Sequence, residues 1–365
     1  IDTFCFVTTN ATFSSVFVQK QLNKLGKNTL LLVDEAHNFG AFNLRKTLNP
    51  KFQYRLALSA TLDRHGDPDG TRALYAYFGD KCIEYSLERA IRENKLTPYF
   101  YYPKVVHLTD SELDKYRELS KKVAKQCYKK SDGSVEITEQ GKRLLIERAR
   151  LVAGAVNKVA LLRELMEQYK NDTHMLVYCG AARSNDFSSY ESESDAEGER
   201  QIVSVSKMLG HDLGMKVTHF TSAESASERE KIKYQFANAD PYQAIVAIKC
   251  LDEGVNIPSI KTAFILASST NPKEYIQRRG RVLRKAPNKP HAVIFDFVIL
   301  PTPLDCVCYG SENARLDLSL VKKEIIRMRE FGEISKNPSE ADKLVQELSE
   351  AYGLDTIDEE DFFDE

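Results

Sequence analysis

Apolar and polar positions over the first 100 residues follow strand-like and helix-like spacing in turn. Leu30–Val33 form a continuous apolar run, which is typical of a strand buried on both faces of a parallel sheet. Residues 13–26 place apolar side chains at helical spacing and end at a glycine. Further strands are predicted at residues 3–9 and 54–61. This alternation predicts an α/β fold.

Residues 101–170 have a different pattern, with long amphipathic stretches that predict helices. The stretches cover residues 110–130 and 138–170, and Asp110 and Ser111 are candidate N-caps of the first. Their lysines would suit a basic arm over a nucleic-acid duplex, whereas their apolar positions would suit a packed hairpin. The pattern slightly favours packing.

Strand and helix patterns alternate again from residue 173, which predicts a second doubly wound α/β domain. Its five strand candidates are residues 174–180, 215–221, 244–250, 262–269 and 291–298. Residues 183–200 are polar and acidic and predict a loop. One or two helices and an acidic tail are predicted after residue 310.

Composition narrows the class of protein only a little. The net charge of −2 gives no global basic signature, but it does not exclude a local nucleic-acid site, because opposite charges elsewhere cancel in the sum. The seven cysteines include no CxxC pair, so we expect reduced thiols and a cytoplasmic protein without a structural zinc. No apolar run is long enough to span a membrane and no signal peptide opens the chain, so no membrane partner is expected.

Two acids, Asp34 and Glu35, directly follow the apolar run that ends at Val33. Ligands of open parallel sheets bind at the carboxyl ends of strands. An aspartate there can hold Mg²⁺, and a neighbouring glutamate can orient and deprotonate a water. The alternative is a helix N-terminus, where the helix dipole favours acidic side chains.

Polar residues at three other places fit the same chemistry. Ser59-Ala60-Thr61 end the next predicted strand at the same edge of the sheet, and Gly254 lies in a turn after the strand at 244–250. Gln277, Arg281 and Arg284 are spaced by four and three, which predicts one helical face with two guanidinium groups. Such groups grip phosphate oxygens in pairs, although most basic helix faces are simply solvated.

The motifs "DEAH", "SAT", "LVYCG", "KCLDEGVNIP" and "QRRGRVLR" occur in an order that resembles motifs II to VI of superfamily 2 helicases. The stretch "LSATLDRHGDPDGTRALYAYFG" is similar to the XPB-like branch, which includes the ATPase motors of restriction systems, and "VTTNATF" resembles motif Ib. The resemblance covers residues 5–300 and implies an α/β fold with tandem RecA-like lobes, a helical insertion and a C-terminal helical tail. The implied boundaries are 1–100 for an incomplete first lobe, 101–170 for a helical connector, 171–310 for the second lobe, and 311–365 for a helical segment with an acidic tail.

The resemblance assigns roles to residues of the first lobe. It implies ATP and Mg²⁺ as cofactors, with Asp34 as the metal ligand and Glu35 as the residue that activates water. His37 and Ser59-Ala60-Thr61 would couple the nucleotide to movement.

Residues of the second lobe receive roles in the same way. Arg281 and Arg284 would be arginine fingers on the γ-phosphate, Gln277 would help to sense that phosphate, and Gly254 would approach the nucleotide through its backbone. Asn256 stands where motif V often has an aspartate, so a contact there would lack the negative charge.

The phosphate-binding loop GxxxxGK[ST] is missing before "DEAH". In "LGKNT", Gln21 replaces the first glycine and Asn28 follows the lysine. We therefore expect the missing half of the first lobe to lie upstream of Ile1, and this chain alone to bind ATP weakly and hydrolyse it poorly.

Nucleic-acid contacts are predicted at hydroxyls and one arginine near strand ends, namely Thr8, Thr9, Arg183, Thr221 and Ser222. Hydroxyls at such places are more often turn residues or helix caps, and an arginine that opens a polar loop is usually solvated.

The expected function is an ATP-dependent DNA helicase or translocase, acting on double-stranded DNA in repair, restriction or phage defence, with partner proteins or fused domains. The alternatives are an RNA helicase of the same superfamily and a non-catalytic module that binds DNA or a partner. The intact acids and both arginines favour a working motor.

Overall fold

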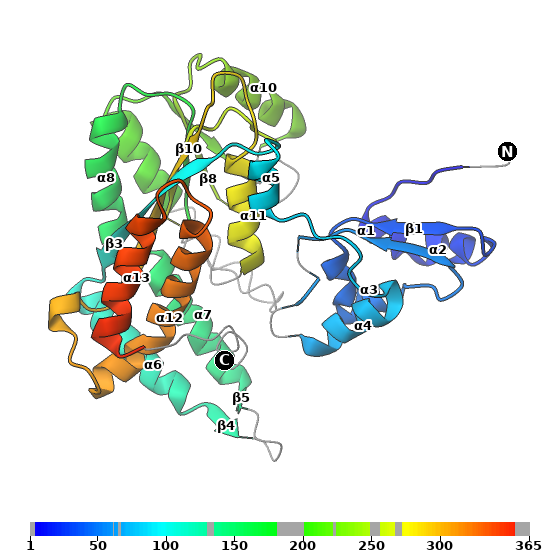
Figure 1. Ribbon diagram of the computed structural model, residues 1–365, viewed down its shortest axis with the longest axis horizontal. Coiled ribbons are helices and arrows are strands. Elements are labelled where there is room, and N and C mark those ends of the chain that lie inside the picture. The colour runs from blue at the N-terminus through cyan, green and yellow to red at the C-terminus, as the bar shows by residue number, and fades with distance from the viewer. Residues whose placement is uncertain are drawn as a thin grey trace. The chain divides into compact units, whose positions relative to one another are not determined.

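The computed structural model describes residues 4–60, 62–64, 67–129, 135–180, 201–221, 224–248, 256–266 and 272–354. The chain divides into two compact units, Ile1–Tyr85 and Ser86–Glu365 (Figure 1). The expected boundary at residue 100 therefore differs from the division that the structure shows.

The first unit is built on a pair of parallel strands in which Leu30 lies opposite Tyr54 and Val33 lies opposite Ala57. Its elements are β1 (Leu30–Val33), β2 (Tyr54–Ala57), α1 (Asn10–Phe13), α2 (Val16–Leu22), the 3-10 helix η1 (Ala36–Gly40), α3 (Phe42–Arg45) and α4 (Pro68–Phe78). A small core of buried side chains joins the strand pair to the helices, and it contains Phe13, Val33, Ala36, Phe39 and Leu74.

Two predictions for the first unit are wrong. Residues 4–9 form no strand, because the segment leads into α1, where the Thr9 side chain caps the helix by accepting from the Thr12 N–H. β1 is not buried on both faces, since the side chains of Leu30 and Leu32 are 57% and 53% exposed. The core of described residues packs against one face of β1 only, through Val33.

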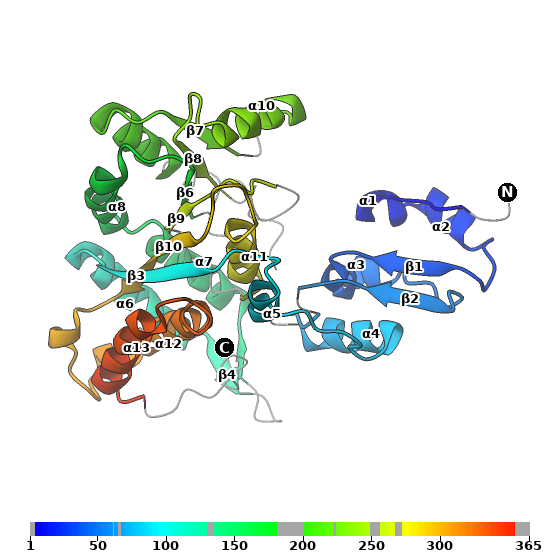
Figure 2. The same cartoon turned by 45° about the horizontal axis from the view of Figure 1, so that its top comes forward.

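The second unit contains a six-stranded parallel sheet with the order β3-β10-β9-β6-β8-β7. Figure 2 shows these strands as a twisted sheet with helices on both sides. The strands are β3 (Tyr99–His107), β6 (Met175–Tyr178), β7 (Val217–Phe220), β8 (Ala244–Ala247), β9 (Thr262–Ile265) and β10 (Ala292–Leu300). All five strands predicted after residue 173 are present, so the second α/β domain is confirmed in its strand positions.

β3 was not predicted, because its residues fall in the expected helical connector and include Pro103. A proline has no N–H to donate and is tolerated at the edge of a sheet, which is where β3 lies. β3 pairs with β10 along nine residues, so the segment expected to begin a connector begins instead as a sheet strand.

Two helical layers cover the sheet. One hydrophobic cluster includes side chains of α10 (Ala226–Ala237), α11 (Pro272–Val282), α12 (Glu312–Gly332) and α13 (Pro338–Tyr352). The other includes side chains of α6 (Asp110–Ala124), α7 (Glu139–Ala153), α8 (Asn157–Tyr169) and the helical segment 201–212. The remaining elements are α5 (Leu87–Arg92), β4 (Cys127–Lys129), β5 (Val135–Ile137) and η3 (Leu304–Cys306).

The predicted helices at 110–130 and 138–170 are present as α6, α7 and α8, but the first begins at a different cap and ends at Ala124, because Cys127–Lys129 form the strand β4. Thr109 is the N-cap of α6 and forms a capping box with Glu112, so Asp110 and Ser111 lie inside the helix. The ribbon β4–β5 extends the hairpin of α6 and α7.

α12 and α13 are part of the second unit's core rather than a separate tail. Val321, Ile325 and Met328 of α12 are fully buried. Arg327 of α12 also donates from Nε to Asp296 Oδ2 of β10 at 3.0 Å, and its Nη2 lies 2.6 Å from Glu324 Oε2. A buried charge must be paired in this way to be tolerated.

Candidate functional site

The chain turns sharply at the acids that follow β1. Glu35 has φ 49° and ψ 47°, a left-handed conformation that is uncommon for a residue with a side chain. Asp34 Oδ1 accepts a hydrogen bond from the Glu35 backbone N–H at 2.9 Å. Both residues lie at the carboxyl end of β1, because they directly follow Val33. Asp34 is exposed and Glu35 is half-buried. Backbone strain of this kind is concentrated at functional sites.

His37 and Ser59 are brought together across the strand pair. His37 is 7% exposed, and its Nδ1 lies 3.0 Å from the Ser59 hydroxyl and 3.4 Å from Glu35 Oε2. The backbone supports this contact, because the Ala36 N–H donates to the Leu58 carbonyl at 3.0 Å. Two of the predicted coupling positions therefore meet, while Ala60 is exposed beside them.

Arg64 is a further residue of this region that was not assigned a role from the sequence. Its Nη1 donates to the His37 carbonyl at 2.6 Å, and its Nε donates to Asp67 Oδ2 at 2.7 Å. Gly40 leaves room for the arginine, since a Cβ there would lie 2.2 Å from Arg64 Cδ. Arg64 lies in the stretch that resembles the XPB-like branch, and that resemblance was the available signal.

The predicted arginine face of the second unit is only partly helical. Gln277 and Arg281 lie on α11, but the helix ends at Val282 and Arg284 lies beyond it in an antiparallel bridge with Leu96. The prediction that Gln277, Arg281 and Arg284 share one helical face is therefore wrong for Arg284. The spacing alone could not reveal that the chain leaves the helix at this point.

Arg284 is instead connected to Asn256. Its Nη1 donates to Asn256 Oδ1 at 2.6 Å, which joins the segment of motif V to that of motif VI. Burial lowers the pKa of Arg284, and the nearby positive charge of Arg281 lowers it further. The two guanidinium groups thus lie close enough to repel each other, and a bound anion would reduce this repulsion.

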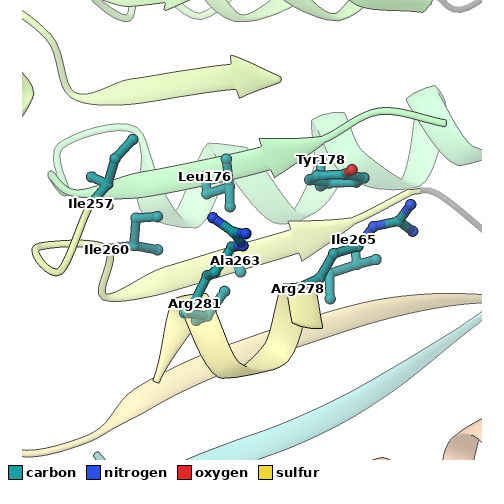
Figure 3. Close-up of a pocket in the computed structure, with 9 residues that line it drawn as sticks. Leu176, Tyr178, Ile257, Ile260, Ala263, Ile265, Arg278 and Arg281 are labelled. Atoms are coloured by element: carbon teal, nitrogen blue, oxygen red, sulfur yellow. The ribbon is translucent and has the colours of Figure 1, made fainter. Parts of the chain in front are cut away.

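A small pocket lies between α11 and strands β6 and β9. Figure 3 shows the side chains of Arg278 and Arg281 rising from the helix beside Ile265 and Ala263. Arg278, which was not predicted as a site residue, is 8% exposed and lies over the Tyr178 ring at 4.3 Å. The lining is otherwise apolar, from Leu176, Ile257, Ile260 and Val282.

Arg279 has a different role from its neighbours on α11, because its side chain is directed into the protein core. It is 1% exposed, donates from Nη1 to the Glu330 carbonyl at 2.5 Å, and pairs through Nη2 with Glu330 Oε1 at 2.6 Å. It also lies over the Phe331 ring at 4.8 Å. Arg279 therefore anchors α11 to α12.

The threonines predicted to touch nucleic acid have local partners. Thr8 Oγ1 donates to the Thr9 carbonyl at 3.3 Å, and Thr9 caps α1. Thr221 donates from Oγ1 to Glu224 Oε2 at 3.0 Å. These contacts match the alternative of turn and cap residues, and binding to nucleic acid stays a prediction.

Four predicted site residues, Thr61, Arg183, Ser222 and Gly254, lie outside the described residues.

The described part of the chain contains no group of three or more His, Cys, Asp or Glu side chains that could hold a metal ion. Nucleotide-bound Mg²⁺ needs only one or two carboxylates, because phosphates and waters complete its shell. The exposed Asp34 carboxylate fits that mode of binding. None of the described helices is long and apolar enough to cross a membrane.

Comparison with known proteins gives one family match. Residues 157–286 match the helicase conserved C-terminal domain, which covers α8, β6 to β9 and α11. This range contains Asn256, Gln277, Arg281 and Arg284.

Two sequence relatives have informative names. The chain is 25% identical over 294 residues to the DNA 3'-5' translocase XPB2 of Sulfurisphaera tokodaii, covering 75% of this chain and 60% of the relative. It is 24% identical over 333 residues to the type I restriction enzyme MjaIXP endonuclease subunit of Methanocaldococcus jannaschii, covering 82% of this chain and 28% of the relative. The chain thus spans less than two thirds of the length of these relatives.

Among solved structures, the chain is similar to the DNA-bound restriction-modification enzyme LlaBIII, with a TM-score of 0.48 and 14% identity over 87% of this chain and 21% of that one. The domain match and the two sequence relatives agree with the resemblance that the motifs carry. The chain therefore contains a helicase C-terminal domain at residues 157–286 and is similar in sequence to an XPB-type translocase and to a restriction-enzyme subunit.

Proposed function

We propose that the intact protein is a DNA-dependent ATPase that uses ATP hydrolysis to move along or unwind DNA. The observation that supports this most directly is that motif residues far apart in sequence meet within each unit. His37 meets Ser59 in the first unit, and Asn256 meets Arg284 in the second.

The first unit would act on the metal and the attacking water. Asp34 would hold Mg²⁺, which neutralises charge on the phosphates when it is bound. Glu35 would orient the attacking water and accept a proton from it. Its left-handed backbone conformation would set the direction of the carboxylate. His37 contacts both Glu35 and Ser59, so a change at the carboxylate would reach the end of β2.

The second unit would act on the γ-phosphate. Arg281 and Arg284 would stabilise negative charge on the transferring group, a contribution worth about 10³ to 10⁵ in rate for an arginine finger. Gln277, one turn before Arg281 on α11, would contact the same phosphate. Asn256 would hold the Arg284 guanidinium in place through its side-chain oxygen.

DNA is the proposed substrate because one relative is named a DNA translocase and another a restriction enzyme subunit. Thr8, Thr9 and Thr221, together with Arg183 and Ser222, are the proposed contacts. The names of these relatives also support a second part of the proposal: the intact protein has fused domains or partner proteins of a repair or restriction system. An RNA helicase is the alternative that the experiment must exclude.

The test is ATP hydrolysis by the full-length protein with double-stranded DNA, single-stranded DNA or RNA added. Strong stimulation by DNA is expected, and stimulation by RNA alone would replace the proposal with its alternative. Glu35→Gln should abolish turnover and leave ATP binding intact, because the amide cannot accept the proton. If turnover survives in Glu35→Gln, another residue activates the water.

A further inference from the structure

The ammonium group of Lys289 is buried among three backbone carbonyls. Its Nζ donates to the carbonyls of Val282 at 2.6 Å, Arg284 at 2.7 Å and Pro258 at 3.1 Å. An ammonium group has three N–H donors, so these contacts use all of them. The residue is 7% exposed, and burial lowers its pKa to about 8, which leaves it mostly protonated at pH 7.

The three carbonyls belong to two segments that meet at the end of α11. Val282 is the last residue of the helix and Arg284 lies two residues beyond it, so Lys289 donates to a carbonyl that the end of the helix leaves unpaired and to one just past that end. Pro258 lies two residues after Asn256, whose side chain holds the Arg284 guanidinium. A positive charge at a helix C-terminus is also favoured by the helix dipole.

The segment before β3 makes further contacts with the same backbone. The Thr97 N–H donates to the Leu283 carbonyl at 2.7 Å, and Thr97 Oγ1 contacts the Arg284 carbonyl at 3.4 Å. Leu96 forms the bridge with Arg284. The backbone of Arg284 is therefore held by Lys289 and by the segment before β3, while its side chain is held by Asn256.

We propose that Lys289 is a positioning residue for Arg284. By joining the carbonyls of Pro258 and Arg284 through one ammonium group, it keeps Asn256 and Arg284 at the separation at which their side chains bond. This inference rests on the proposed function, in which Arg284 stabilises the transferring phosphate. Lys289 itself touches neither phosphate nor water.

The direct test replaces Lys289 with methionine, which has a similar length but no donors. The full-length protein with Lys289→Met should lose about 10²-fold in kcat with DNA present, because a small misplacement of a catalytic group can cost that much. Its KM for ATP should change little. Lys285→Met is the matched control, since Lys285 lies four residues earlier, is exposed and bonds only the side chain of Asn94 among the contacts described; it should keep the wild-type rate.

A variant in the Arg284→Ala background separates positioning from general stability. If Lys289 acts through Arg284, then Lys289→Met should cause no further loss of kcat once Arg284 is gone. An equal loss in both backgrounds would overturn the proposal, as would a wild-type rate for Lys289→Met. If Lys289→Met does not fold, Lys289→Gln takes its place, because the amide retains two N–H donors and should give a smaller loss that again disappears in Arg284→Ala.

The wild-type protein distinguishes this inference from the proposed function. Absence of DNA-stimulated hydrolysis by wild type would remove the proposed function, whereas normal hydrolysis by both wild type and Lys289→Met would remove only the role of Lys289.

Discussion

His37 Nδ1 lies 3.0 Å from the Ser59 hydroxyl, which connects the turn that follows β1 to the end of β2. The two residues are 22 positions apart, and the contact is partly buried. Because His37 also lies beside Glu35, the pair forms a continuous path from the proposed water-activating carboxylate to the next strand.

Ser59→Ala should separate hydrolysis from movement. The change removes one hydrogen bond worth about 1 kcal/mol, so ATP turnover should stay within a few-fold of wild type. Translocation should fall much further, because the signal from Glu35 no longer reaches β2. The measurement is DNA translocation and ATP hydrolysis on the same preparation. Thr47→Val is the control, since it removes another hydroxyl bond of the first unit, to the Leu44 carbonyl; an equal effect in both variants would contradict a coupling role.

Arg284→Ala should reduce DNA-stimulated kcat by about 10³-fold, in the range of a lost arginine finger. Asn256→Ala should reduce it by a smaller factor, because the guanidinium remains but loses its 2.6 Å hydrogen bond. Asn256→Asp keeps an acceptor at the same place and should be closer to wild type. The measurement is the steady-state rate of ATP hydrolysis with DNA present. An unchanged rate in Arg284→Ala would show that Arg284 does not stabilise the transferring phosphate.

Breaking the Arg279–Glu330 contact should destabilise the second unit. Arg279→Met leaves the Glu330 carboxylate and carbonyl without their buried partner, and because the Glu330 side chain is 39% exposed and stays partly solvated, the expected loss is about 1–3 kcal/mol. Glu330→Gln should cost at least as much, because it leaves the guanidinium of Arg279, which is 1% exposed, without its negatively charged partner. The fraction of each variant that resists brief tryptic digestion at increasing urea concentrations would give its free energy of unfolding.

The control for the Arg279 variants is Arg92→Met in the same unit. Arg92 and Glu88 form an exposed pair at 3.9 Å, and such pairs contribute about 0–1 kcal/mol. A similar loss of stability in Arg92→Met and Arg279→Met would show that the buried Arg279–Glu330 contact contributes no more than an exposed ion pair.

Cys179 should resist alkylation in the folded protein. Burial raises the pKa of its thiol to about 12, so the reactive thiolate is scarce at pH 8. The thiols that are exposed among the described residues, Cys5, Cys82, Cys127, Cys306 and Cys308, should react first. Mass spectrometry after iodoacetamide treatment would show this, and early labelling of Cys179 would contradict the described core.

The same shift fixes the sign of a pH effect on stability. Between about pH 9 and 12 the unfolded thiol of Cys179 releases its proton while the folded thiol keeps it, so the unfolded state binds fewer protons. The free energy of unfolding should therefore fall as pH rises through that window. Cys179→Ala should reduce the slope.

The sequence predicted strands well where they are short, apolar and central. Ala244–Ala247 and Thr262–Ile265 are buried at every position, and such runs have few alternatives between two helical layers. The sequence-based prediction missed β3, an edge strand that contains Pro103. It was wrong at residues 4–9, whose β-rich composition suggested a strand although the segment leads into a capped helix.

The candidate site was predictable in its residue types but not in its contacts. Spacing on a helix placed Gln277 and Arg281 together, but nothing local showed that the chain leaves α11 before Arg284. Lys289 and Arg64 were missed because their partners are backbone carbonyls, which have no signature in a sequence.

The position of β3 determines how the second unit can be dissected. The family match ends at residue 286 and starts at 157, so a chain cut to that range would lose both β3 and β10. β9 would then become an uncovered edge whose unpaired N–H and C=O groups invite aggregation. A soluble version of this unit must therefore start before Tyr99 and retain α12, although neither end resembles a helicase motif.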